Sequence, residues 1–300
     1  MANNHSTLTG LFTDIADTIR EKTGGTEPIA ADAFPEAISM IETGGGTDVE
    51  DALVTRTLTE YSNDRVTSIG AYAFYSYNYK SLVSVNFPNV TSIGDSAFTD
   101  CKYLTNVNFP VVTSIGLYAF RGCVSITSAS FTEVTSLGIG AFSGCISLTS
   151  VSFPAVTQLF ASTFYNCTAL NSVYCPAVIN IQQYAFNRCL SLTSVSFPLV
   201  SQIGNYAFYR CSGLATASFP AVTSIGSSAF YSCIGLVSLY MLGSSMASLG
   251  SKNAFFYTPM DDSTYTGNFG SIYVPASLVS EYQAASNWSY YADRITAIEE

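Results

Sequence analysis

The segment AFRGCVSITSASFTEVTSLGIG (residues 119–140) recurs along most of the chain, and it decides the fold. Its Ala-Phe pair aligns with seven other Ala-Phe pairs and with Thr163-Phe164, at spacings of 24, then six times 22, then 25 residues. This places the following phenylalanines in register: Phe74, Phe98, Phe120, Phe142, Phe164, Phe186, Phe208, Phe230 and Phe255. A constant period of this length is the signature of a solenoid, in which each repeat forms one coil. We number the positions of a coil from this phenylalanine, which is position 0.

The apolar residues of each repeat keep fixed offsets from position 0 and predict the core. Cys stands at +3, Leu or Ile at +6, Val or Ala at +9, usually Phe at +11, Val at +14, and Ile or Leu at +17. In LTSVSF (residues 148–153) the Val and the Phe are two apart, which is the period of a strand with one buried face. Pro at +12 would end that strand, and Gly at +18 suits a backbone turn. We therefore expect one short parallel strand in each coil.

Residues 51–255 resemble the BspA-like class of leucine-rich repeats, whose coil carries the pattern I-G-x-x-A-F-x-x-C-x-x-L-x-x-V-x-F-P. Cys175 and Thr132 depart from this pattern, which has Phe and Pro at their positions. The resemblance implies an α/β repeat solenoid of roughly eight coils, each about 22 residues long with one short parallel strand. It also implies a binding role, because such proteins are commonly surface adhesins and recognition modules, although the scaffold serves many partners.

The two ends of the chain differ from the repeats and suggest three parts. Residues 1–45 hold two short amphipathic helical patterns, at 7–22 and 31–41, and residues 46–255 form the solenoid. Residues 256–300 would form a C-terminal cap, with a last strand and a helix that turns Leu278, Val279 and Tyr282 inward. The N-terminal part resembles the helical module of tail-fibre-like proteins of bacterial viruses. That resemblance implies anchoring or oligomerisation, a tail or baseplate-type partner, and a homo-oligomer such as a trimer.

Charge is concentrated at the ends of the chain, although the net charge is -10. Residues 75–250 hold only 3 acidic against 5 basic residues, so the solenoid has no basic stripe for nucleic acid and no electrostatic anchor for an anionic membrane. No run of 18 apolar residues exists, and the first ten residues, MANNHSTLTG, lack the pattern of a Sec signal. We expect synthesis in the cytoplasm, no membrane insertion, and function on a virion tail or outside the cell, with the bacterial cell surface as the alternative.

Catalytic constellations are missing from the repeat pattern. The only histidine, His5, precedes the solenoid, so no Ser-His or Cys-His pair can form within the coils. The carboxylates Asp95 and Asp100, and the pair at 261–262, are expected to be solvated turn residues. Seven cysteines sit 22 residues apart without a C-x-x-C motif, which favours a buried column of free thiols over a metal or redox site. We predict a protein that is not an enzyme and needs no cofactor or metal.

Residues that vary from coil to coil are candidates for binding, because residues fixed in every coil serve the core. Positions +8 and +10 are almost uniformly Ser or Asn, and only Tyr174 and Tyr240 stand out on that strand face. The positions that flank Ala-Phe carry large variable side chains, a combination typical of binding surfaces. The predicted ligand-binding ridge consists of Tyr72, Tyr75, Tyr118, Arg121, Tyr165, Tyr184, Arg188, Tyr206, Tyr209, Arg210 and Tyr231. The alternative is that these tyrosines only shield neighbouring coils.

Three functions of different classes fit the sequence. The first is the receptor-binding component of a viral or virus-like tail, which presents the solenoid to a cell-surface protein or glycan. The second is a bacterial cell-surface adhesin, and the third is a structural spacer whose tyrosines can be substituted freely.

Overall fold

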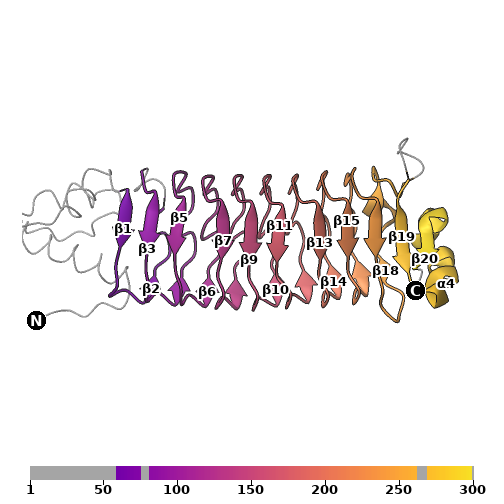
Figure 1. Cartoon of the computed structure of the whole chain (residues 1–300), viewed down its shortest axis with the longest axis horizontal. Coiled ribbons are helices and arrows are strands. Elements are labelled where there is room, and N and C mark those ends of the chain that lie inside the picture. The colour runs from indigo at the N-terminus through magenta and orange to yellow at the C-terminus, as the bar shows by residue number, and fades with distance from the viewer. Residues whose placement is uncertain (1–58, 76–80, 262–268, 299–300) are drawn as a thin grey trace, which may run out of the picture.

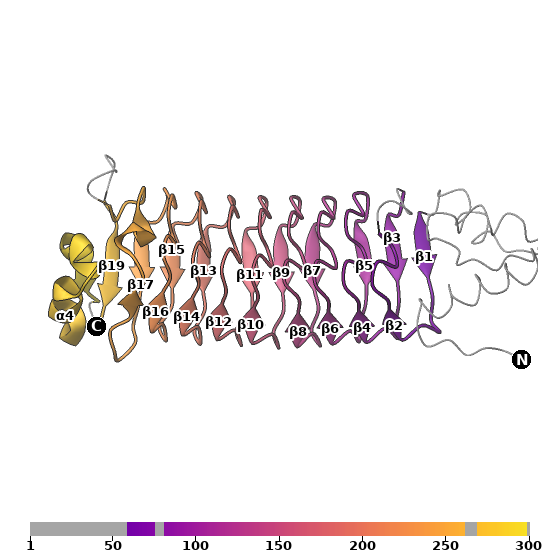
Figure 2. The ribbon, with the colours of Figure 1, turned by 180° about the vertical axis from the view of Figure 1, so that it is seen from behind.

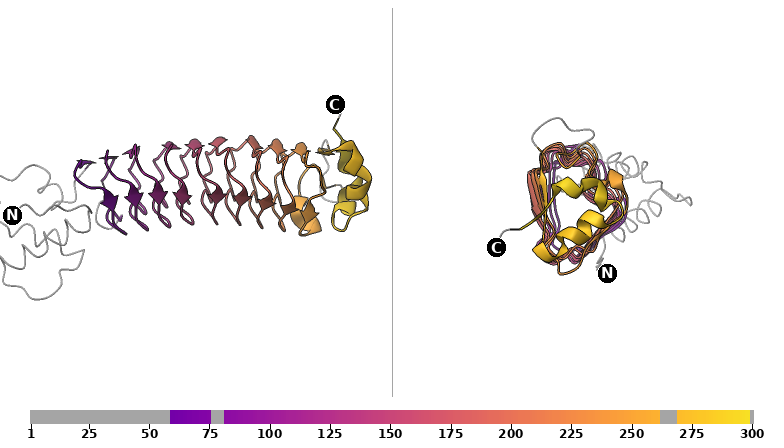
Figure 3. Two further views of the ribbon diagram at one scale, coloured as in Figure 1. Left: turned by 90° about the horizontal axis from the view of Figure 1, so that it is seen from below. Right: turned by 90° about the vertical axis from the view of Figure 1, so that its right-hand side faces the viewer.

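The computed structural model describes residues 59–75, 81–261 and 269–298, and in these residues successive coils stack into a rod (Figure 1). Each coil of the rod is about 22 residues long, and there are about 10 coils. Viewed along the axis, the coils superimpose, and α4 lies across the C-terminal end (Figure 3). The solenoid expected from the repeat is confirmed, with mostly strands and little helix.

Two rows of parallel strands run along the rod (Figures 1 and 2), whereas the sequence predicted one strand per coil. The first row occupies the predicted positions +8 to +10, and the second row pairs the residues at +16 and +17. The first row contains β1 (Glu60–Ser62), β3 (Ser84–Asn86), β5 (Asn106–Asn108), β7 (Ser128–Ser130), β9 (Ser150–Ser152), β11 (Ser172–Tyr174), β13 (Ser194–Ser196), β15 (Thr216–Ser218), β17 (Ser238–Tyr240), β19 (Ser271–Val274) and β20 (Ile295–Ala297). The second row contains β2 (Ser68–Ile69), β4 (Ser92–Ile93), β6 (Ser114–Ile115), β8 (Ser136–Leu137), β10 (Gln158–Leu159), β12 (Asn180–Ile181), β14 (Gln202–Ile203), β16 (Ser224–Ile225) and β18 (Ser248–Leu249). A two-residue strand is too short to show a period of its own, so only the buried apolar residue at +17 signalled it.

The rows are interrupted at different coils. Pairing in the first row stops between β5 and β7 and again between β11 and β13. In the second row it stops between β8 and β10. At each of these coil boundaries the strands of the other row remain paired.

Phenylalanines form two columns inside the rod, one at position 0 and one at +11. Neighbouring rings stack along a column, as Phe98 and Phe120 do with centroids 5.1 Å apart and planes 3° apart. Rings of the two columns also meet, as Phe98 and Phe109 do edge-on at 5.8 Å. Every position 0 ring from Phe74 to Phe255 is fully buried, and each buried ring stabilises the fold by about 2 kcal/mol.

A third ladder of backbone hydrogen bonds joins the coils at the Ala-Phe segment. The N–H groups at -2, 0 and +2 donate to carbonyls of the next coil, as Tyr118, Phe120 and Gly122 do at 2.8–2.9 Å. The residues at -2 and +2 have positive φ, and most of them are not glycine; Tyr118 has φ 55° and Arg210 has φ 58°. The large side chains that flank Ala-Phe therefore stand on a backbone fixed by its hydrogen bonds.

The glycines at +18 allow close contact between coils. A Cβ on Gly138 would lie 2.4 Å from the carbonyl carbon of Gly116 and 2.5 Å from the nitrogen of Leu117. Gly138 opens the predicted turn, because its carbonyl accepts the Ala141 N–H at 3.2 Å. Its φ is not positive, so close approach between coils, and not a left-handed backbone, is what requires glycine here. Phe160 stands at this position in the next coil, and the second row is interrupted between β8 and β10 at that point.

The last residues form a cap that is bonded to the final coils. It contains η2 (Ala276–Leu278), α4 (Val279–Ala284) and η3 (Trp288–Arg294), and η1 (Lys252–Phe255) belongs to the coil that precedes it. The Trp288 indole donates to the Ala247 carbonyl at 2.7 Å, and the Tyr282 hydroxyl accepts from the Ala247 N–H at 2.8 Å. Tyr282 is buried, and Leu278 and Val279 pack against the core, as their spacing suggested.

Candidate recognition surface

A continuous chain of aromatic contacts runs over four neighbouring coils beside the Ala-Phe turns. We define the tyrosine ridge as Tyr184, Tyr206, Tyr209, Arg210, Tyr231 and Tyr257. Tyr184 stacks on Tyr206 at 5.2 Å, and Tyr206 meets Tyr209 edge-on at 5.8 Å. Tyr209 stacks on Tyr231 at 5.2 Å, and Tyr231 meets Tyr257 edge-on at 5.1 Å. The Arg210 guanidinium lies 5.3 Å from the centre of the Tyr209 ring. The structure thus joins five of the predicted ridge residues into one surface.

The other predicted ridge residues lie apart from this surface. Tyr72 and Tyr75 form an edge-on pair at 5.9 Å near the N-terminal end of the rod. Arg121 lies 5.8 Å from the centre of the Tyr118 ring and forms a second pair. Tyr165 and Arg188 are exposed, and within the described residues neither has an aromatic or cation–π contact. Of the predicted set, only the C-terminal members form an extended surface.

Tyr257 belongs to the ridge although the sequence comparison missed it. It occupies +2 after Phe255 and has a φ of 58°; Arg188 and Arg210, at the same position in their coils, also have positive φ, of 63° and 58°. The last repeat is 25 residues long instead of 22, which hid the equivalence. Counting forward from Phe255 would have found it.

On the first strand row the two predicted tyrosines differ in their surroundings. Tyr174 is 58% exposed at the end of β11, where pairing of the row stops. Tyr240 stacks on Tyr273 of the next strand with ring centroids 4.7 Å apart. Tyr273 lies outside the regular repeats, so repeat comparison alone could not identify it.

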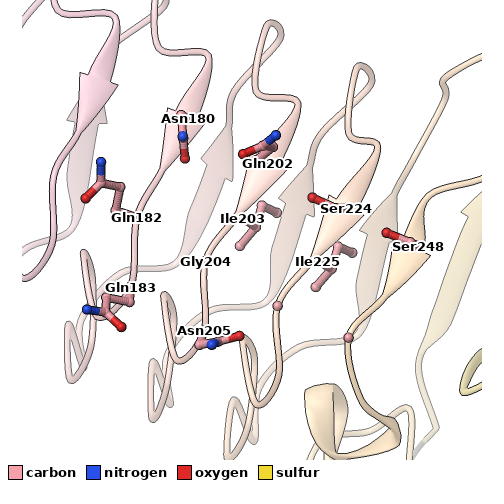
Figure 4. Close-up of a pocket in the computed structure, with 12 residues that line it drawn as sticks. Asn180, Gln182, Gln183, Gln202, Ile203, Gly204, Asn205, Ser224, Ile225 and Ser248 are labelled. Atoms are coloured by element: carbon pink, nitrogen blue, oxygen red, sulfur yellow. The ribbon is translucent and has the colours of Figure 1, made fainter.

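A shallow groove of about 530 Å³ crosses the second strand row between β12 and β18 (Figure 4). Gly204, Gly226 and Gly250 border it, with Ile203 and Ile225 between them. Carboxamide side chains line it: Asn180, Gln182, Gln183, Gln202 and Asn205. The groove was not predicted, because its amides stand at +16, +18 and +19, outside the strand face at +8 to +10 and the flanks of Ala-Phe.

Two predicted turn carboxylates have structural contacts. Asp95 Oδ1 accepts a hydrogen bond at 2.7 Å from the Leu117 N–H of the next coil. Asp261 is fully buried, which corrects the expectation of a solvated side chain. Its carboxylate accepts from the Tyr257 N–H at 3.2 Å and from the Tyr290 hydroxyl at 3.3 Å, so it holds the cap against the last coil. His5 and residue 262 lie outside the described residues.

The cysteines at +3 form the predicted buried column of free thiols. Each thiol donates to the position 0 carbonyl of the preceding coil, as Cys123 does to Phe98 at 3.0 Å. The same carbonyl accepts the Cys101 N–H at 3.1 Å, so the thiol supplies a second partner to a buried acceptor. In the described part of the chain, no three His, Cys, Asp or Glu residues are grouped to hold a metal ion.

We expect these thiols to be unreactive in the folded protein. Burial raises the pKa of Cys145 to about 12, so almost no thiolate, the reactive form, exists near neutral pH. The thiol of an unfolded chain has a pKa of about 8.5. The free energy of unfolding is therefore not reduced by this thiol below that pH, and it decreases as pH rises toward 12, because the unfolded chain loses the proton first. DTNB should label the eight cysteines only in denaturant, and guanidinium unfolding should occur at lower concentration at high pH. Rapid labelling of the folded protein would contradict this.

Comparison with known proteins identifies the repeat. Residues 67–189 and 157–276 match the family model described as BspA type leucine rich repeat region. A search of curated proteins gives no match. No helix in the described part of the chain is long and apolar enough to cross a membrane.

Several solved structures are similar to this chain. A leucine-rich repeat protein from Bacteroides ovatus is 22% identical, with 82% of this chain and 85% of that chain covered and a TM-score of 0.48. One from Eubacterium ventriosum is 33% identical over 51% of this chain and 43% of that chain, also with a TM-score of 0.48. A leucine rich cell surface protein from Faecalibacterium prausnitzii is 21% identical over 81% and 89%, with a TM-score of 0.42.

The family assignment rests on the repeat model alone. The matched repeats begin at residue 67, and residues 1–45 lie outside the described residues. The predicted resemblance of that segment to tail-fibre-like proteins therefore finds no support in these comparisons.

Proposed function

Because the chain belongs to the BspA-type leucine-rich repeat family, we propose that it is a non-enzymatic recognition protein that binds a cell-surface protein or glycan. The observation that carries the proposal is the tyrosine ridge. Its members contact one another across successive coils and stand on backbone fixed by the third ladder. Rings held in this way lose little entropy when a partner covers them, which is why Tyr and Arg dominate binding hot spots.

Two observations favour binding over a role as a shield for the coils beneath the ridge. The buried columns of phenylalanine already fill the interior, and the ridge tyrosines keep part of their surface open to solvent. Arg210 remains exposed beside Tyr209, so the surface offers ring faces, hydroxyl groups and one cation. A spacer would not require these groups to be adjacent.

Substitution of Tyr209, Arg210 and Tyr231 by Ala tests the proposal. Loss of three hot-spot side chains should weaken attachment at least 30-fold, the equivalent of about 2 kcal/mol. Fluorescently labelled protein would be titrated onto bacterial and epithelial cells and counted by flow cytometry.

The matched control replaces Tyr103 and Leu199 by Ala, because both are more than half exposed and neither belongs to the predicted or the observed ridge. Both variants should unfold at the same temperature as the parent protein. If the ridge variant attaches as well as the control, the ridge is not the binding surface.

Two settings remain for this recognition protein. As a component of a phage-like tail it would be anchored through residues 1–45 and could form a trimer. As a bacterial surface adhesin it would be displayed by the cell that makes it.

Light scattering with and without residues 1–45 tests whether this segment forms an oligomer. An antibody to the solenoid, used to probe purified virions and cell envelopes, distinguishes the two settings. The ridge experiment is independent of which setting applies.

A further inference from the structure

The groove on the second strand row carries unpaired carboxamides. Asn180, Gln182, Gln183 and Gln202 make no side-chain hydrogen bond to any described residue, and they are partly or fully exposed along the groove (Figure 4). Asn205 differs, because its Oδ1 accepts the Ser227 N–H at 2.8 Å. That bond fixes the orientation of the Asn205 amide, and its NH₂ group has no acceptor among the described residues.

These amides are a local departure from the repeat. At +16 most coils have Ser, but Gln158, Asn180 and Gln202 occupy three neighbouring coils, and the last two line the groove. At +18 Gln182 replaces the usual Gly, and at +19 Gln183 and Asn205 are again neighbours. The core does not require this change, because Ile181 and Ile203 remain buried at +17 as in other coils.

The groove is uncharged. Its polar lining consists of carboxamides, the hydroxyls of Ser224 and Ser248, and backbone groups, with no Asp, Glu, Lys or Arg. A carboxamide both donates and accepts, and therefore matches a hydroxyl group, which does the same. A phosphorylated or carboxylated ligand would find no cation here to pair with.

Two tyrosines stand next to groove residues in the chain, on the side of the Ala-Phe turn. Tyr184 and Tyr206 follow Gln183 and Asn205 directly in the chain, and their rings are stacked with planes 6° apart. Both tyrosines are half-buried, so part of each remains open to solvent. The apolar C–H face of a pyranose packs on such a surface while its hydroxyls bond to neighbouring amides.

From this arrangement we propose that the groove binds a linear, uncharged glycan. Neighbouring parallel strands lie about 4.8 Å apart, which is close to the length of one pyranose residue in an extended chain. The polar side chains at equivalent positions of β12, β14, β16 and β18 therefore recur at about the spacing of successive sugars. The inference rests on the proposed recognition function and assigns the glycan to the groove, with Tyr184 and Tyr206 as its aromatic border.

The test is an array of immobilised neutral and acidic glycans, probed with the full chain. We expect retention on linear neutral glycans and not on acidic ones. The best neutral oligosaccharide is then titrated by calorimetry against a variant with Asn180, Gln182 and Gln202 replaced by Ala, for which affinity should fall at least tenfold. A second variant, Gln182→Glu with Gln202→Glu, keeps the side-chain size but removes the hydrogen-bond donors. Its affinity for the oligosaccharide should fall by a similar factor.

Gln158→Ala is the matched control, because Gln158 occupies +16 in the coil before the groove and does not line it. It should bind like the parent protein. Binding of acidic glycans only, or equal affinity for the Ala and Glu variants and the parent, overturns the inference. The inference is also overturned if protease treatment of the cells abolishes attachment and the neutral oligosaccharide does not compete with the cells for the protein. In each of these cases the ridge variant at Tyr209, Arg210 and Tyr231 still tests the proposed function separately.

Discussion

Replacement of Phe142 by Ala is expected to destabilise the protein by about 3 to 5 kcal/mol, the range for removing a buried aromatic ring from a core. Phe142 is fully buried and contacts four other rings, including Phe120 at 5.2 Å and Phe153 at 5.7 Å. Its removal would leave a cavity that spans both phenylalanine columns. Because each coil of a solenoid contacts only its neighbours, only the two adjacent coils could repack around this cavity.

Guanidinium unfolding followed by far-UV circular dichroism measures the effect. The matched control is Ile146→Ala in the same coil, because Ile146 is 43% exposed and should change stability by less than about 1 kcal/mol. A Phe142 variant as stable as this control would show that the coils repack around the missing ring. The phenylalanine columns would then contribute less than their burial indicates.

Replacement of Gly138 by Ala is expected to cost about 3 kcal/mol, although only one methyl group is added. The new Cβ would lie 2.4 to 2.5 Å from backbone atoms of Gly116 and Leu117, and backbone held in strand ladders on both sides cannot move away cheaply. The two coils would have to separate, which would weaken the β6–β8 pairing.

Gly250→Ala is the control for this prediction, because Gly250 follows β18 in the same row but a Cβ there would be 3.1 Å from its nearest neighbour. It should cost less than about 1 kcal/mol. Equal losses for the two variants would mean that general backbone entropy, and not contact between coils, explains the glycines. Thermal unfolding of both proteins in parallel gives the comparison.

The solenoid could be predicted because its period and its core lie in the sequence itself. Phe at 0 and +11, Cys at +3 and the strand at +8 to +10 all occupy their expected places. The second strand row could not be predicted, because two residues such as Ser114–Ile115 have no measurable alternation. The positive φ at -2 and +2 was also hidden, because Tyr, Arg, Ser and Asn mostly occupy these positions and only Gly122, Gly140 and Gly144 hinted at it.

The candidate site was predictable only in part, because contacts between coils depend on where each offset lies in space. Tyr206 and Tyr209 were identified by their variation, but their contacts with Tyr184 and Tyr231 required the stacking geometry. The groove needed a comparison at +16 to +19, where Gln202 and its neighbours depart from Ser and Gly. Variation between repeats marks candidate positions, and the coil geometry then decides which of them form a surface.

The interruptions of the two strand rows have a mechanical consequence. They fall at different coil boundaries, so β6 and β8 remain paired where the first row stops after β5, and β7 and β9 remain paired where the second row stops. The third ladder crosses these boundaries as well. Under tension along the axis, every boundary between these coils therefore bears load through at least two sets of backbone hydrogen bonds. A protein that holds a target at one end of a rod would resist being pulled apart without disulfide bonds among its described coils.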